Sequence, residues 1–255
     1  MEQPQYGEQA KSLFKDGQKL LADIVQNKRA KLRAVVGLWK ASSDGDDVVL
    51  EGGETLRFLR QQTEHQAEEP FYCLADFVAP KASHRNDFIG GFAATAGQEI
   101  EDYALSLKKN NDDYNGILVQ ALSDRLAEAT AEYLHKKVRE IWVYGKAEKF
   151  SVEDLIKEKY RGIRPAAGYP SCPDHTEKAV LWRLLDAQKR TGISLTSSYA
   201  MQPGSSVSGL YFSHPDSRYF NVGRIGKDQV EDYAKRKGMS VAEVEKWLGP
   251  NLGYA

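Results

Sequence analysis

The stretch DDYNGILVQALSDRLAEATAEYLHKKVREIW, residues 112–142, decides the fold class. Its apolar residues recur at helical spacing from about Asp113 up to Trp142. They form a wide stripe consisting of Ile117, Leu118, Ala121, Leu122, Leu126, Ala127, Ala131, Leu134 and Val138. Strand-like segments fall in two groups, 34–97 and 195–225, on either side of this helical block. That order predicts an α+β fold and disfavours alternating βαβ units.

On the N-terminal side we expect a helix at 8–28 and another near 99–109. Four segments read as strands, with a polar connection that could hold a short helix or strand. The segments 34–41 and 46–52 form a predicted hairpin, TLRFLRQQTEHQAEEP follows as the connection, and 71–80 and 87–97 are apolar strands bounded by Pro and Gly.

On the C-terminal side, Ser151 with Glu153 and Asp154 predicts a helix start for 151–160. Thr176 is a candidate cap for a helix that ends at Thr191-Gly192. Strands are expected in 195–215 and 217–225, and helices in 227–238 and 240–249, each closed by glycine.

Composition narrows the function classes. The chain has 255 residues, 41% hydrophobic and 28% charged, with a net charge of −1, which argues against a nucleic-acid binder. No run reaches the roughly 18 apolar residues of a membrane span, and the N-terminus resembles no secretory signal. Cys73 and Cys172 are far apart, so we expect free thiols in a reducing cytoplasm and no membrane partner.

Familiar catalytic signatures are missing. There is no P-loop, dinucleotide fingerprint, nucleophile elbow or HExxH motif. The five histidines stand at 65, 84, 135, 175 and 214, none at metal-ligand spacing from another His or Cys, so no metal site is expected.

The segment RGIRPAAGYPSCPDHTEK, residues 161–178, is the most unusual loop. Pro165 and Pro170 hold the preceding residues extended, and Gly168 permits a positive φ and a close backbone approach. The fixed main-chain groups could read an adenine edge, while Arg164 suits a carboxylate and Tyr169 adds an aromatic face. An Ω-like loop packed on the core, with Arg164 as an internal staple, is an equally good interpretation.

Acids and aromatics give further candidates. Asp76 interrupts an apolar segment, so it is either paired, ligand-facing or at a solvated edge. Asp124 and Glu128 share one helix face and repel, which calls for Arg125, Arg164 or a cationic ligand nearby unless the face is simply solvated. On a strand, Tyr219 and Phe220 would point to opposite faces.

Five segments together closely resemble the activation domain of cobalamin-dependent methionine synthase. They are the 161–178 loop, YCLADFVAP, DDYNGILVQALSDRLAEATAEYLHKKVR, AMQPGSSVSGLYFSHPDSRYF and KDQVEDYAKRKGMSVAEVEKWLGPNLGY. The resemblance runs from about Glu8 to Tyr254. It implies a bent α+β domain with a twisted antiparallel sheet flanked by helices and a shallow ligand groove.

The resemblance also implies a function. In this family the domain presents S-adenosylmethionine to oxidised cob(II)alamin, a reduced flavodoxin or equivalent reductase supplies the electron, and methylcobalamin is restored for methionine biosynthesis. Cobalamin and zinc are bound by other domains of that methyltransferase (5-methyltetrahydrofolate–homocysteine methyltransferase). The isolated domain would have no catalytic residue of its own and no complete activity.

Residue roles follow by the same resemblance. Arg164 would meet the ligand's carboxylate, the Ala166 backbone its adenine, and Tyr169 would stand near the sulfonium and the corrin. Glu128 would lie at the ligand's charged end. Tyr219 and Phe220 would line the ligand, and Asp124 would meet the cobalamin domain's displaced axial histidine. Cys172 and His175 become the least favoured participants.

One departure leaves an alternative open. The family's extreme N-terminal segment, with an Asp-Trp-Thr-Pro-Phe-Phe-like stretch whose Asp helps hold the ligand, has no counterpart in residues 1–255, which we take as one activation domain. The alternative is an interaction module that docks a cobalamin domain or flavodoxin without its own ligand. An independent methyltransferase is weakly supported, since no glycine-rich loop follows a first strand.

Overall fold

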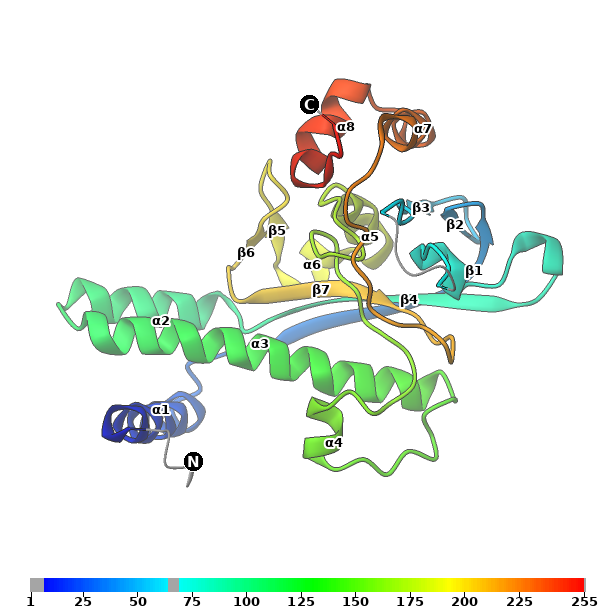
Figure 1. Ribbon diagram of the computed structural model, residues 1–255. Coiled ribbons are helices and arrows are strands. Elements are labelled where there is room, and N and C mark those ends of the chain that lie inside the picture. Colours follow the sequence, from blue (N-terminus) through cyan, green and yellow to red (C-terminus); the bar gives the residue numbers. More distant parts are fainter. Residues whose placement is uncertain (1–6, 64–68, 255) are drawn as a thin grey trace.

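The computed structural model describes residues 7–63 and 69–254. Its centre is a five-stranded sheet, ordered β3-β2-β1-β4-β7, in which every neighbouring pair is antiparallel (Figure 1). The strands are β1 (Arg33–Asp44), β2 (Asp47–Leu50), β3 (Thr55–Arg57), β4 (Asp87–Thr95) and β7 (Ser206–Tyr211). A two-stranded ribbon is made by β5 (Ser194–Leu195) and β6 (Met201–Gln202). The α+β prediction is confirmed.

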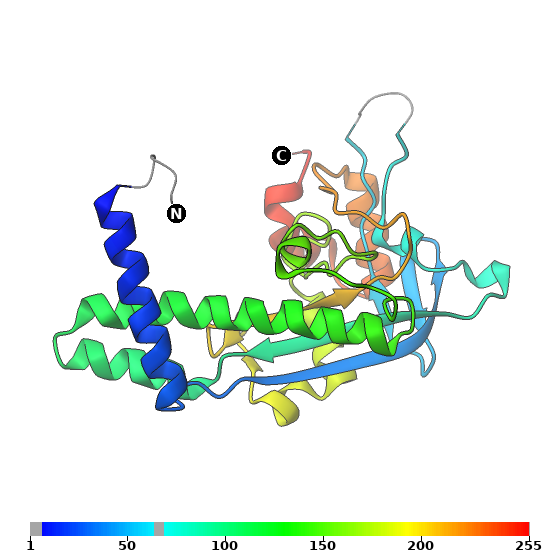
Figure 2. The same cartoon turned by 90° about the horizontal axis from the view of Figure 1, so that it is seen from below.

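Helices cover both faces of the sheet. They are α1 (Glu8–Gln26), α2 (Gln98–Lys109), α3 (Asp113–Ile141), α4 (Val152–Ile156), α5 (Glu177–Leu185), α6 (Ala187–Thr191), α7 (Lys227–Lys237) and α8 (Val241–Leu248), with short 3-10 turns η1 (Leu74–Phe77), η2 (Lys81–Ser83) and η3 (Gly249–Asn251). The long helix α3 runs along one face and α5 with α6 lie on the other, while α1 crosses the α2–α3 hairpin (Figures 1 and 2).

The central strand β4 explains how both faces can be covered. From Ile89 to Thr95 every residue is buried, so its sequence is continuously apolar or small rather than alternating. A Cβ on Gly91 would come 2.6 Å from Cδ1 of Leu181, so the missing side chain lets α5 approach the sheet closely. The strand is therefore a two-sided core strand.

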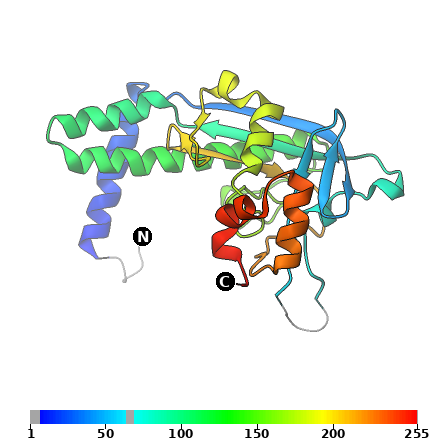
Figure 3. The same ribbon diagram turned by 90° about the horizontal axis from the view of Figure 1, so that it is seen from above.

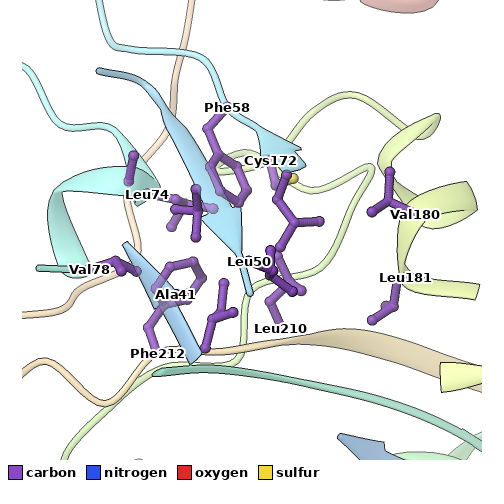
Figure 4. Packing of buried hydrophobic residues seen from close by; sticks show 14 of the residues in the cluster. Ala41, Leu50, Phe58, Leu74, Val78, Cys172, Val180, Leu181, Leu210 and Phe212 are labelled. Atoms are coloured by element: carbon purple, nitrogen blue, oxygen red, sulfur yellow. The ribbon is translucent and has the colours of Figure 1, made fainter. Parts of the chain in front are cut away.

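The largest core cluster lies on the α5 side of the sheet. Phe58, Leu74, Leu181 and Leu210 come from distant parts of the chain and meet there with almost no exposed surface (Figure 4). A second cluster joins α7 and α8 to Leu59 and Val222, and it forms the C-terminal end of the molecule (Figure 3).

Two predicted strands are wrong. Residues 71–80 contain the turn η1, in which Asp76 accepts a hydrogen bond from the Cys73 amide at 2.8 Å and pairs with Arg60 at 2.7 Å. The paired alternative for Asp76 is therefore the right one. Residues 217–225 form no strand, and main-chain groups there bond to loops instead, as when the Val222 amide donates to Pro170 O at 2.9 Å.

The helix predictions need three corrections. The segment after Thr176 breaks at Asp186, whose φ of 49° is left-handed, so α5 and α6 are separate helices. The capping box at Ser151 and Asp154 is present, but α4 has only 5 residues. Third, the buried face of α3 differs from the predicted apolar stripe, because it includes Ser123 and His135, whereas Ile117 is 60% exposed. Within the part of the chain described here, no helix is both long and apolar enough to span a membrane.

Candidate ligand groove

A groove of about 620 Å³ opens between α3 and α5 at the edge strand β7. Its walls come from three places far apart in sequence: the clasp, defined as residues 164–171, the segment 200–208, and the pair Tyr219 and Phe220. Glu128 and Ala131 contribute from α3, and His175 and Lys178 from the opposite side. The groove therefore spans the sheet edge from one helical layer to the other.

Local hydrogen bonds make the clasp rigid. The Gly168 amide donates to Cys172 O at 2.7 Å, and the Cys172 amide donates back to Tyr169 O at 2.8 Å. Gly168 has a φ of +97°, and a Cβ there would lie 2.1 Å from Cε1 of His175. Only glycine fits, as the sequence predicted. The carbonyl of Pro165 accepts from the Leu210 amide at 2.8 Å, which fixes the clasp to β7.

The middle of the clasp keeps polar main-chain groups available. Among the described residues, the Ala166 amide and both main-chain groups of Ala167 take part in no hydrogen bond. Both residues line the groove and are partly exposed. A fixed donor and acceptor side by side match the edge of a purine base, which offers one of each.

Arg164 is both an internal staple and a groove residue. Its Nη2 lies 2.6 Å from Oε2 of Glu132, and Nη1 contacts Tyr160 OH and, at 3.3 Å, Nδ1 of His135. Within residues 7–63 and 69–254 its Nε makes no hydrogen bond. Nη2 also lies 3.6 Å from Oε1 of Glu158, so Nε keeps the donor that a ligand carboxylate could accept from.

Burial keeps the histidine beneath Arg164 neutral. Desolvation, reinforced by Arg139 and Arg164, lowers the pKa of His135 to about 2. Its Nδ1 can therefore accept a hydrogen bond from Arg164 throughout the physiological pH range.

Two acidic residues of α3, Asp124 and Glu128, have different partners. Glu128 lines the groove, and Oε2 pairs with Nη1 of Arg125 at 2.7 Å on the helix surface. Asp124 does not line it: Oδ1 accepts a hydrogen bond from Ser205 Oγ at 2.8 Å. Arg125 thus offsets the repulsion expected between them, while Arg164 pairs with Glu132 instead.

Aromatic side chains edge the groove. Tyr219 and Phe220 both line it, but the strand predicted for them is wrong, because the segment is a loop without the two-residue period. Phe220 also packs against the core, whereas Tyr219 is 47% exposed. The Tyr219 hydroxyl accepts from the Arg164 amide at 3.0 Å, which positions the ring. Tyr169 is 65% exposed, so most of its ring faces solvent.

The structure thus brings together all six residues expected to hold a ligand: Arg164, Ala166, Tyr169, Glu128, Tyr219 and Phe220. Sequence reasoning missed Lys178 and set His175 aside, yet both line the groove. It also missed Glu132, whose partnership with Arg164 depends on how α3 lies against the clasp. The spacing of Glu128 and Glu132, one helical turn apart, could have signalled it.

No group of three or more His, Cys, Asp or Glu side chains among the described residues is arranged to hold a metal ion. The groove offers charged, hydrogen-bonding and aromatic groups around a preformed hollow. The fold and this site are those of an α+β module with a preformed groove for a small molecule at the edge of its sheet.

Comparison with known proteins agrees. The family described as "Vitamin B12 dependent methionine synthase, activation domain" matches residues 1–238. The crystal structure of the MetH reactivation domain bound to AdoHcy is similar, with 53% sequence identity and a TM-score of 0.96, covering 100% of this chain and 80% of that one. The chain belongs to the activation-domain family of vitamin B12-dependent methionine synthase, and that family is part of a cobalamin-dependent methyltransferase.

Proposed function

We propose that the groove binds S-adenosylmethionine and presents its methyl group to cobalamin held by another domain. The observation that carries this is the groove itself, which combines a carboxylate-binding arginine, an acid for a cationic centre and a free main-chain edge for a purine. A similar domain was crystallised with AdoHcy, the demethylated form of the same ligand.

Each part of the ligand has a candidate partner. Arg164 would bind the carboxylate, Glu128 would stabilise the positive charge, and the Ala166 backbone would bind adenine. Tyr219 and Phe220 would pack against the ligand, and the exposed Tyr169 would meet the corrin when the domains dock. The protein's contribution to the reaction is positioning, since the methyl acceptor is the cobalamin.

Two partners complete the proposal. Asp124 stands on the exposed side of α3, where the cobalamin-binding domain would meet it, and a reduced flavodoxin or equivalent reductase would supply the electron. We place the reaction in the cytoplasm. The buried, unpaired thiols of Cys73 and Cys172 suit a reducing compartment.

The test combines this chain with a cobalamin-binding domain that carries cob(II)alamin, reduced flavodoxin and S-adenosylmethionine. The absorption spectrum should change to that of methylcobalamin. S-adenosylhomocysteine, which fits the groove but has no methyl group to transfer, should give no change. Equal conversion of cob(II)alamin to methylcobalamin with and without this chain would contradict the proposal. Docking to the cobalamin-binding domain that does not depend on S-adenosylmethionine would favour a pure interaction module.

A further inference from the structure

A buried lysine occupies the α5 side of the groove. Lys178 is only 7% exposed, and its Nζ donates to Nδ1 of His175 at 2.9 Å and to Tyr199 O at 3.1 Å. An ammonium group has three N–H donors, so one remains. Among the described residues Lys178 forms no ion pair with a carboxylate.

A buried cation without an acid is costly unless something else compensates it. Burial lowers the pKa of Lys178, which reflects this cost. Lys237, which is similarly buried but does not line the groove, has carboxylate partners: it pairs with Asp174 and Glu177 at 2.7 Å each. Lys178 instead lines the groove, where a ligand could supply the missing acceptor.

The place of Lys178 in the groove indicates which part of the ligand would supply this acceptor. Glu128 belongs to α3 and Lys178 to α5, and these helices pack on opposite faces of the sheet. The ammonium would repel a sulfonium, so the two cations belong at opposite ends of the groove. Lys178 also lines a narrow recess together with Ala167, whose main-chain groups are free. A purine base would therefore lie at the α5 end.

We propose that Lys178 donates a hydrogen bond to N3 or N7 of the adenine base and so determines the groove's specificity for the base. This inference rests on the proposed binding of S-adenosylmethionine. His175 and Tyr199 hold the ammonium in place, and Gly168, which packs on the His175 ring, couples that position to the shape of the clasp.

The experiment is calorimetric titration of the wild type and Lys178→Met with S-adenosylhomocysteine and its 3-deaza, 7-deaza and 2′-deoxy analogues. Lys178→Met should weaken S-adenosylhomocysteine binding roughly 10- to 100-fold, as expected for a lost hydrogen bond from a charged donor. One of the two deaza analogues lacks the nitrogen that accepts this hydrogen bond. The wild type and Lys178→Met should bind that analogue with almost equal affinity. Arg183→Met is the matched control, because Arg183 lies on the same helix but pairs with Glu54 at the surface.

Three results would overturn the inference: an unchanged affinity in Lys178→Met, the same loss for every analogue, or a loss that vanishes only for the 2′-deoxy ligand. A wild-type protein that binds none of these ligands would refute the proposed function itself, and this inference with it. Thermal unfolding without ligand checks the variants. If Lys178→Met does not fold, Lys178→Gln, which keeps a donor for Tyr199, replaces it in the same comparison.

Discussion

At the scale of single residues, we expect Arg164 to contribute to both stability and ligand binding through different atoms of one guanidinium. Nη1 contacts Tyr160 and His135 and Nη2 pairs with Glu132, while Nε makes no hydrogen bond within the described residues. Because Glu132 is only 21% exposed, removing Arg164 also leaves an acid without its cation. We therefore expect ligand binding and stability to be linked at this residue.

Arg164→Ala should weaken S-adenosylhomocysteine binding about 100-fold, because a charge-assisted carboxylate contact is lost. Binding of 5′-methylthioadenosine, which has no carboxylate, should change little. The free energy of unfolding should fall by about 2 kcal/mol. Titration calorimetry and urea unfolding measure the two effects.

Two variants serve as controls. Arg161→Ala removes a neighbouring exposed arginine that bonds to Ser213 O and should leave both quantities nearly unchanged. Glu132→Gln combined with Arg164→Ala should recover stability but not affinity. An equal loss for both ligands in Arg164→Ala would contradict the assigned role.

His135 makes stability depend on pH. Its pKa is about 2 when folded, from burial and from Arg139 and Arg164, but near 6.5 when unfolded. The unfolded chain therefore binds the proton, so the stabilisation is complete above about pH 6.5 and is lost as pH falls. Between about pH 7.5 and 5.5 this histidine should reduce the free energy of unfolding by about 1.4 kcal/mol.

Urea unfolding at both pH values measures this. His135→Gln, which keeps a polar side chain without the titration, should show a smaller loss by that amount. His84→Asn, at an exposed residue, should behave like the wild type. Identical losses in all three proteins would show that His135 does not titrate as described.

At the scale of elements, the clasp illustrates what sequence can and cannot foretell. Pro165 and Gly168 predict a stiff loop with a positive φ, and this is found. The partners of that loop were not predictable, because Glu132 and His175 meet it only through tertiary packing. Lys178 was missed for a similar reason, since a lysine in the first turn of a helix usually faces solvent.

The long helix shows a second limit. Its extent was predicted almost to the residue, but its buried face only in part: Ala127, Ala131 and Val138 of the predicted stripe are buried. The polar residues Ser123 and His135 are also buried, whereas Ile117, which hydropathy places in the apolar stripe, is 60% exposed. The strand predicted at 71–80 was wrong because its apolar residues serve a buried turn, where Asp76 caps the chain.

Gly168→Ala tests the rigidity of the clasp. The new Cβ would clash with the His175 ring, and the left-handed backbone adds about 1–2 kcal/mol of strain. We expect ligand affinity to fall at least about tenfold, because the clasp must shift. Gly192→Ala is a close control, with a φ of +81° but nothing within 4 Å of its Cβ. It should cost similar stability and leave affinity unchanged, and a parallel loss of affinity would contradict this account.

At the scale of the whole molecule, the groove depends on parts that are distant in sequence. The sheet holds α3 and α5 on opposite faces, and the clasp bridges them along β7. A buried ion-pair network of Lys237 with Asp174 and Glu177 then fastens α7 to the segment that follows the clasp. This arrangement preforms the site, so little ordering is required when a ligand binds.

The most direct test of the central claim is calorimetric titration of this chain, alone, with S-adenosylmethionine, supported by thermal unfolding. We expect saturable binding of one ligand and an unfolding temperature that rises with ligand concentration, because the ligand binds only the native state. Adenosine and methionine, each lacking half of the contacts, should bind far more weakly. No binding heat and no shift in unfolding temperature at millimolar ligand would contradict the claim.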